Sequence, residues 1–171
     1  FSSAFCWFIS SSLASAEPTT LVWPQAPDQG RIEYLYSFSK PEDLKIEKNT
    51  GSKILSFIFG KGKSGEERLV RPQGIAVRAG IIYVTDTGQG CLHVFNEKDK
   101  KYFSISKAGD SLLRSPVGVA VDQKGTIYVS DSQLNRVFIF NSKILFRGEL
   151  GAGKFSRPTG IAVDDSSGRI Y

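Results

Sequence analysis

The heptapeptide RPQGIAV at residues 71–77 returns as SPVGVAV at 115–121 and as RPTGIAV at 157–163. The proline of the second copy lies 44 residues beyond that of the first, and the third proline lies 42 residues beyond the second. Self-similarity at a fixed period of about 20 to 50 residues is the sequence signature of repeat architectures. The three heptapeptides therefore indicate a chain built from one repeated unit.

Two further motifs keep the same phase as the heptapeptides. IIYVTD at 81–86 returns as TIYVSD at 126–131 and begins again as RIY at 169–171. CLHVFN at 91–96 returns as RVFIFN at 136–141. All of these motifs are short, rich in β-branched or aromatic residues and bounded by turn residues, which is typical of strands.

The spacing of the motifs predicts four strands in each repeat. The heptapeptides predict an inner strand packed on both faces, and weaker fourth strands are expected within 101–105 and 143–150. Glycine-bearing links at 78–80 and 122–125 predict tight antiparallel hairpins, because glycine supplies the positive φ that such turns demand. Four strands in about 40 to 50 residues is the arithmetic of a propeller blade.

The three motifs also resemble a known family over residues 69–171. Pro-x-Gly-Ile-Ala-Val, then Ile-Tyr-Val-x-Asp-Thr/Ser, then Arg-Val-x-x-Phe is similar to the NHL repeat. The resemblance implies an all-β β-propeller of four-stranded antiparallel blades, six-bladed when complete, with about half present here. It implies two complete blades and a truncated third, and the chain also resembles bacterial exported six-bladed propeller proteins.

Positions that recur in the repeats are expected to have structural roles rather than to bind metal. Asp131 to Val137 is similar to the family's Asp-x-Gly-Asn-x-Arg turn, which implies that the aspartate is supported by the arginine. Cys91 stands where that arginine is usual in the preceding repeat, so the support is expected to be lost there. The structural positions are Pro72, Gly74, Asp86, Pro116, Gly118, Asp131, Arg136, Pro158 and Gly160.

Residues 1–16 have the order of a secretory signal. They carry no charge, are apolar at first, turn serine-rich and end in Ala14-Ser15-Ala16, with small residues where a signal peptidase cleaves. The segment is too short to span a bilayer, which needs about 20 mostly apolar residues. A buried N-terminal strand is one alternative, and a lipid-modified Cys6 is another that the bulky Phe5 disfavours. Cleavage would leave Cys91 without a disulfide partner.

The region between the signal and the repeats is less regular. Residues 17–30 are expected to form an extended leader, and residues 31–68 a closing strand and a degenerate first blade. The strand is placed at 31–38, where it would complete the last blade of a ring. Glu42 and Asp43 are placed at the start of an inner strand and are therefore ligand or channel-mouth candidates. Residues 52–59 fit either a short helix or an outer strand.

The formal net charge of +5 admits a nucleic acid or another acidic partner. The basic residues are scattered through the chain without a long run, which favours solvated loops instead. No nucleic acid partner is therefore expected.

Few residues offer catalytic chemistry. His93 is the only histidine, so a two-histidine metal site cannot be built from this chain. Its alternation with Leu92 and Val94 predicts a position on a blade surface. A nucleophile–base pair with Cys91 is expected to be geometrically poor, on the reasoning that the two side chains point to opposite faces of the strand. We expect no catalytic or metal-ligating residue and no cofactor in this part of the protein.

Two functions follow from the fold and the resemblance. The first is a non-catalytic scaffold that binds a protein, peptide or glycan at the channel face, without a membrane span in the mature chain. The second is a metal-dependent lyase or lactonase of the six-bladed type, whose calcium or zinc would be held by residues of the complete protein. The signal segment predicts export to the periplasm or the cell exterior.

Overall fold

A computed structural model describes residues 21–46 and 67–171. The predicted signal segment and the predicted helix or strand at 52–59 lie outside these residues. The chain divides into two units, residues 1–37 and 38–171, and each is described by itself.

The first unit contains one small hairpin. Strand β1 (Val22–Trp23) pairs antiparallel with β2 (Ile32–Glu33). Of the strand predicted over 31–38, only Ile32 and Glu33 are in a strand here, and their partner is β1; the predicted closure of the last blade stays a prediction. Prolines and glycine at 24–30 turn the chain back on itself, so the leader pairs locally.

The second unit begins with a short 3-10 helix, η1 (Pro41–Leu44). Leu44 and Ile46 are buried against Ile82, Val84 and Phe95, which lie on one face of the following sheet. The sequence predicted the start of an inner strand at Glu42 and Asp43, but the structure has the 3-10 helix η1 there.

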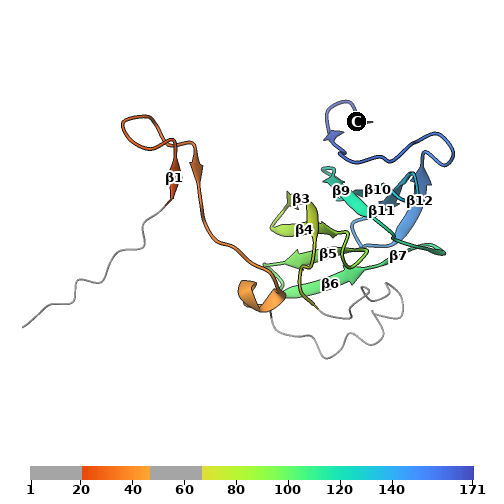
Figure 1. Cartoon of the computed structure of the whole chain (residues 1–171), viewed down its shortest axis with the longest axis horizontal. Helices are drawn as coiled ribbons and strands as arrows, with labels where there is room; N and C mark the ends of the chain where they lie inside the picture. The colour runs from red at the N-terminus through yellow and green to blue at the C-terminus, as the bar shows by residue number, and fades with distance from the viewer. Residues whose placement is uncertain (1–20, 47–66) are drawn as a thin grey trace, which may run out of the picture. The chain divides into compact units, whose positions relative to one another are not determined.

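Two four-stranded antiparallel sheets follow, one for each complete repeat (Figure 1). The first, blade 1, has the order β3 (Pro72–Arg78), β4 (Ile81–Asp86), β5 (Cys91–Asn96), β6 (Lys101–Ile105). The second, blade 2, consists of β9 (Pro116–Val121), β10 (Ile127–Asp131), β11 (Arg136–Phe140) and β12 (Phe146–Leu150). The predicted order and number of strands in each repeat are confirmed.

Two shorter hairpins complete the second unit. Strands β7 (Lys107–Ala108) and β8 (Ser111–Leu112) pair between the blades. Strands β13 (Val163–Asp164) and β14 (Arg169–Ile170) are the inner hairpin of the third repeat. Gly80 (φ 77°) and Gly125 (φ 78°) occupy the left-handed region in the inner hairpin turns, as their positions in the repeat predict.

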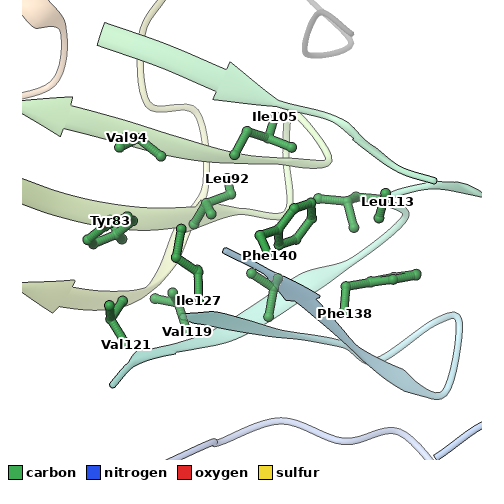
Figure 2. Close-up of a cluster of buried hydrophobic side chains, with 12 residues drawn as sticks. Tyr83, Leu92, Val94, Ile105, Leu113, Val119, Val121, Ile127, Phe138 and Phe140 are labelled. Atoms are coloured by element: carbon green, nitrogen blue, oxygen red, sulfur yellow. The ribbon is translucent and has the colours of Figure 1, made fainter. Parts of the chain in front are cut away.

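The main core lies between the two blades. One face of blade 1 presents Tyr83, Leu92, Val94 and Ile105, and the facing side of blade 2 presents Val119, Val121, Ile127, Phe138 and Phe140 (Figure 2). Alternate residues of a strand point to opposite faces, so each strand supplies this core with every second side chain. Face-to-face packing of consecutive sheets is the propeller arrangement.

The inner strands of the two blades differ in exposure. Val119 and Val121 of β9 are 7% and 8% exposed, because blade 1 covers them. Their equivalents in β3, Ile75 and Val77, are 64% and 65% exposed. The prediction that inner strands are packed on both faces holds for β9; among the described residues, none covers Ile75 and Val77 of β3.

Hydroxyl groups join each inner strand to the next blade. Thr85 accepts a hydrogen bond from the Gly74 amide (2.8 Å) and donates one to the Val117 carbonyl of blade 2 (2.7 Å). Ser130 accepts from the Gly118 amide (2.9 Å) and donates to the Thr159 carbonyl of the third repeat. The same bridge therefore connects all three inner strands.

The bridges explain two repeat glycines. A Cβ at Gly74 would lie 2.5 Å from the Val117 carbonyl oxygen, and one at Gly118 would lie 2.3 Å from that of Thr159. Neither distance is compatible with a side chain, so glycine is required wherever the next blade's backbone approaches this closely. Among the described residues, no next-blade carbonyl lies beside Gly160, and a Cβ there would meet no atom within 4 Å.

Candidate functional site

The repeated aspartates end the second strand of each blade and are fully buried. Asp86 accepts hydrogen bonds from the backbone amides of Val70 (2.6 Å), Arg71 (3.0 Å) and Gln89 (2.9 Å). The carboxylate thus fixes both the segment that enters the inner strand and the turn after β4. Its oxygens are directed at the protein's own backbone rather than at solvent.

Asp131 has the same position in blade 2. Its carboxylate accepts hydrogen bonds from the amides of Arg114 (2.7 Å), Ser115 (3.1 Å), Gln133 (3.1 Å) and Leu134 (3.0 Å). These contacts favour the structural role proposed for both aspartates, because carboxylates that accept several amide hydrogen bonds have little capacity left for a ligand.

The arginine of the repeat turn does not support the aspartate. Arg136 lies opposite Asp131 in the sheet register, but its Nη1 donates to both carboxylate oxygens of Glu149 in β12 (2.8 and 2.9 Å) and forms an ion pair with that residue. The expected Asp-to-Arg contact is therefore replaced by a cross-strand pair. Backbone amides already satisfy the carboxylate, and the guanidinium instead pairs with the neighbouring strand and donates from Nε to the Leu134 carbonyl of its own turn (3.3 Å).

Blade 1 has a buried polar cluster where blade 2 has this ion pair. His93 Nδ1 lies 2.8 Å from the Tyr102 hydroxyl, and its Nε2 lies 3.3 Å from Cys91 Sγ and 3.6 Å from Asp86 Oδ2. In the tautomer with the proton on Nε2, the Tyr102 hydroxyl donates to Nδ1 and the Nε2–H faces Cys91 and Asp86. We call Asp86, Cys91, His93 and Tyr102 the histidine cluster.

The histidine cluster corrects two sequence predictions. His93 was expected on a blade surface, but it is fully buried between Phe95 and Tyr102. Cys91 and His93 were expected on opposite faces, but they are two residues apart and side chains with that separation share a face. The contact between them is therefore real, although it is sealed from solvent.

The electrostatics of the cluster oppose nucleophilic chemistry. Burial, together with the negative charge of Asp86, raises the pKa of the Cys91 thiol to about 12. Burial also tends to raise the pKa of Asp86, but hydrogen bonds from His93 and the backbone amides hold it well below its usual range. The cysteine is thus a thiol at neutral pH, and the thiolate is the reactive form.

The N-terminal candidates lie at η1. Asp43 accepts hydrogen bonds from the Ser39 amide (2.8 Å) and the Lys40 amide (3.3 Å), which lower its pKa despite the opposing effect of desolvation. It therefore stabilises the start of η1. Glu42 is exposed in the same turn. The sequence predicted that these residues lie at the start of an inner strand, but they lie in η1 instead.

A further polar contact joins all three repeats at the C-terminal ends of the inner strands. Arg78 of β3 donates hydrogen bonds to the Val121 carbonyl of β9 (3.1 Å) and to the Asp165 carboxylate of the third repeat (2.9 Å). Asp165 also accepts from the Gln123 amide (2.7 Å). Nothing in the repeat motifs signals this contact, because its residues differ from blade to blade.

The part of the chain that the structure describes contains no group of three or more His, Cys, Asp or Glu side chains placed to hold a metal ion. Nor does any helix within residues 21–46 and 67–171 have the length and apolar character to cross a membrane.

Stacked four-stranded antiparallel blades, joined strand to strand around a common axis, define this protein as a β-propeller. Solved structures with this fold include virginiamycin B lyase from Staphylococcus aureus, with a TM-score of 0.51 and 18% identity over 58% of this chain and 33% of that one. A chain of the nidogen/laminin complex matches with a TM-score of 0.50 and 24% identity, over 64% of this chain and 43% of that one.

Residues 69–95 and 113–140 match the NHL repeat. The chain therefore carries NHL repeats, in the two blades that the structure shows complete. The protein brain tumor of Drosophila melanogaster is 32% identical over 117 residues, which are 66% of this chain and 11% of that protein. The chain thus spans a small part of that relative and less than half of each of these two solved chains.

Proposed function

We propose that this protein is a non-catalytic binding propeller that engages a protein, peptide or glycan at an end of its inner strands. The observation that carries this proposal is the internal use of its reactive groups. Asp86 and Asp131 bind backbone amides, and His93 and Cys91 are enclosed in the histidine cluster. This internal use of the reactive groups of blades 1 and 2 supports recognition over bond cleavage.

The ends of the inner strands are suited to recognition because loops from three repeats meet there. At the C-terminal ends, Arg78, Gln123 and Asp165 already form hydrogen bonds between repeats. Loops positioned by a rigid scaffold are where binding residues concentrate. A ligand at either end would contact several blades at once.

The experiment is metal analysis and activity measurement on the purified full chain. We expect no stoichiometric calcium or zinc and no lactone hydrolysis or lyase activity, with saturable binding to members of a peptide or glycan array. Stoichiometric metal together with turnover of a lactone or a lyase substrate would overturn the proposal. That result would favour the second hypothesis, a metal-dependent lyase or lactonase, for which the likeness to virginiamycin B lyase supplies the fold alone.

Export is a separate part of the proposal and rests on residues 1–16. When the chain is expressed with residues 1–16 in a secreting host, the mature protein should begin at Glu17, because Ala14 and Ala16 fit a signal peptidase site. N-terminal sequencing measures this directly. A retained, uncleaved N-terminus would contradict it.

A further inference from the structure

The segments that lead into the three inner strands share a composition that the repeat motif does not require. They read RLVRP at 68–72, LLRSP at 112–116 and KFSRP at 154–158. Each combines basic with apolar residues and contains no acidic residue. Each ends at the proline that begins its repeat.

The hydroxyl bridges place these segments at one end of the propeller. Thr85 joins Gly74 to Val117, and Ser130 joins Gly118 to Thr159. The inner strands are therefore aligned nearly residue for residue and run in the same direction. The segments that precede them consequently lie at the same end, opposite the end that contains Arg78.

An exposed arginine and an exposed apolar side chain come from each segment. Val70, Leu112 and Phe155 are 52%, 54% and 43% exposed. The arginines nearest to them in the chain are exposed as well. We call this set the arginine patch, which consists of Val70, Arg71, Leu112, Arg114, Phe155 and Arg157.

Side chains of neighbouring turns hold the backbone of each arginine in place. The amide of Arg71 donates to Asp86 (3.0 Å), that of Arg114 to Asp131 (2.7 Å) and that of Arg157 to Asn135 (2.8 Å). Arg157 is held in the left-handed region, at a φ of 48°. Strained backbone that the surrounding structure maintains is concentrated at functional sites. The guanidinium groups are thus carried on fixed attachment points, which lowers the entropic cost of binding.

Asp86 and Asp131 use their carboxylates to accept hydrogen bonds from the backbone of the arginine-bearing segments. The carboxylates of Asp86 and Asp131 are buried and accept from backbone amides. The charged groups that reach solvent within segments 68–72, 112–116 and 154–158 are all basic, and Glu67, which precedes the first segment, is half-buried. An approaching partner therefore meets positive charge with apolar side chains beside it.

We propose that the arginine patch binds an acidic, partly apolar segment of a partner protein. Arginine forks match carboxylates in a bidentate geometry. The apolar side chains favour a peptide over a sulfated glycan, which has no apolar side chains to cover them. Phe155 is the single aromatic residue of the patch, whereas single-stranded nucleic acids are bound by successive aromatic platforms. The inference rests on the proposed binding function and names its partner class.

The test uses the full chain and a labelled peptide in which pairs of glutamates alternate with leucine. Fluorescence anisotropy reports its binding, and a peptide with glutamine in place of glutamate is the matched probe. The patch variant carries Arg71→Gln, Arg114→Gln and Arg157→Gln. The control variant carries Lys98→Gln, Lys124→Gln and Lys143→Gln, which removes the same charge from exposed turns away from the patch. The hydrogen bonds that hold the arginines use backbone amides, so thermal melting should show both variants folded.

We expect the patch variant to weaken binding by about tenfold or more and the control variant by less than about twofold, because charge-assisted contacts act locally. The glutamine peptide should bind as weakly as the patch variant binds the acidic peptide. Equal weakening by the two variants would overturn the proposal, since net charge would then explain the binding. Tighter, patch-dependent binding of heparin or of an oligonucleotide would also overturn it, by assigning another partner class.

This outcome is separable from that of the proposed function. Metal-dependent turnover would refute the binding role as a whole. Array binding that survives in the patch variant would leave the binding role intact and refute the arginine patch.

Discussion

Blades 1 and 2 solve the same structural problem with different side chains. Both place a buried aspartate at the end of the second strand, and both satisfy it with amides from the preceding segment and the following turn. Blade 1 adds the histidine cluster behind Asp86, whereas blade 2 has Phe138 at the position of His93 and an Arg136–Glu149 pair at its surface. The comparison teaches that backbone amides are the invariant partner of the aspartate.

The largest effect on stability is expected when the buried aspartate of either blade is removed. Asp131→Ala and Asp86→Ala should each lower the free energy of unfolding by about 3 to 5 kcal/mol, because several buried amides lose their acceptor. Denaturant titration of the two variants measures the cost. Similar losses would sharpen the comparison, and a loss under about 1 kcal/mol in either blade would show that its amides find other acceptors.

Asp86 also predicts acid sensitivity. The pKa of Asp86 is lower in the folded chain than its ordinary value of 3.8. Its contribution to stability is therefore fully present above that value and is lost as the pH falls below it. Stability measured from pH 5 down to pH 2 should decline more steeply in the wild type than in Asp86→Asn, and parallel curves would contradict this assignment.

Gly118→Ala tests the close approach between blades. A Cβ there would lie 2.3 Å from the Thr159 carbonyl oxygen, so we expect a loss of about 2 to 3 kcal/mol as the backbone shifts. Gly160→Ala is the matched control in the third repeat, where a Cβ meets no atom within 4 Å. Thermal and chemical denaturation should separate the two variants. Indistinguishable stabilities would mean that the blades adjust without cost.

His93→Phe converts the core of blade 1 towards that of blade 2. It removes the partner of the Tyr102 hydroxyl, so we expect a loss of about 1 to 2 kcal/mol. The double variant with Tyr102→Phe should recover much of that loss, because no orphaned hydroxyl remains. A double-mutant cycle gives the coupling. Strictly additive losses would show that the contact contributes nothing.

The smallest effect is expected at the surface of blade 2. Arg136→Gln removes an ion pair whose side chains are each 31% exposed, and such pairs contribute about 1 kcal/mol or less. Chemical denaturation at low and at high salt should show a small loss that shrinks as salt rises. A large loss would indicate that the arginine supports the turn, as the family resemblance implied.

How far the sequence predicts this structure depends on repetition. The strands of blades 1 and 2 were predictable because each motif occurs at least twice, and the constant distance between copies fixes where each strand lies in the repeat. The bridging hydroxyls were missed, although Thr85 and Ser130 occupy the same motif position in both blades and supplied that signal. Predictions for segments that occur only once were less successful. Asp43 was assigned to a strand by a distant likeness to the motif, whereas its local hydrogen bonds to Ser39 and Lys40 favour a helical turn.

The alternation of side chains along the strand was not enough to predict the surroundings of His93. A period of two places Cys91 and His93 on one face, but it does not say whether that face is covered. Phe38, Leu44 and Ile46 come from a segment without repeat character, and they line the core beside Phe95. Burial in that part of blade 1 therefore depends on residues that no pattern in the repeats identifies.

The hydroxyl bridges have a consequence for how such a protein can change its length during evolution. A glycine, a hydroxyl and the next blade's carbonyl must meet in every bridge, so an insertion within the inner strands would separate all three. Variation is tolerated instead between the third strand of one repeat and the first proline of the next, which are 21 residues apart from Phe95 to Pro116 and 18 from Phe140 to Pro158. Gene duplication can add whole units, whereas small insertions are expected in the turns and links outside the inner strands, as in the links 78–80 and 122–125, which differ in length by one residue.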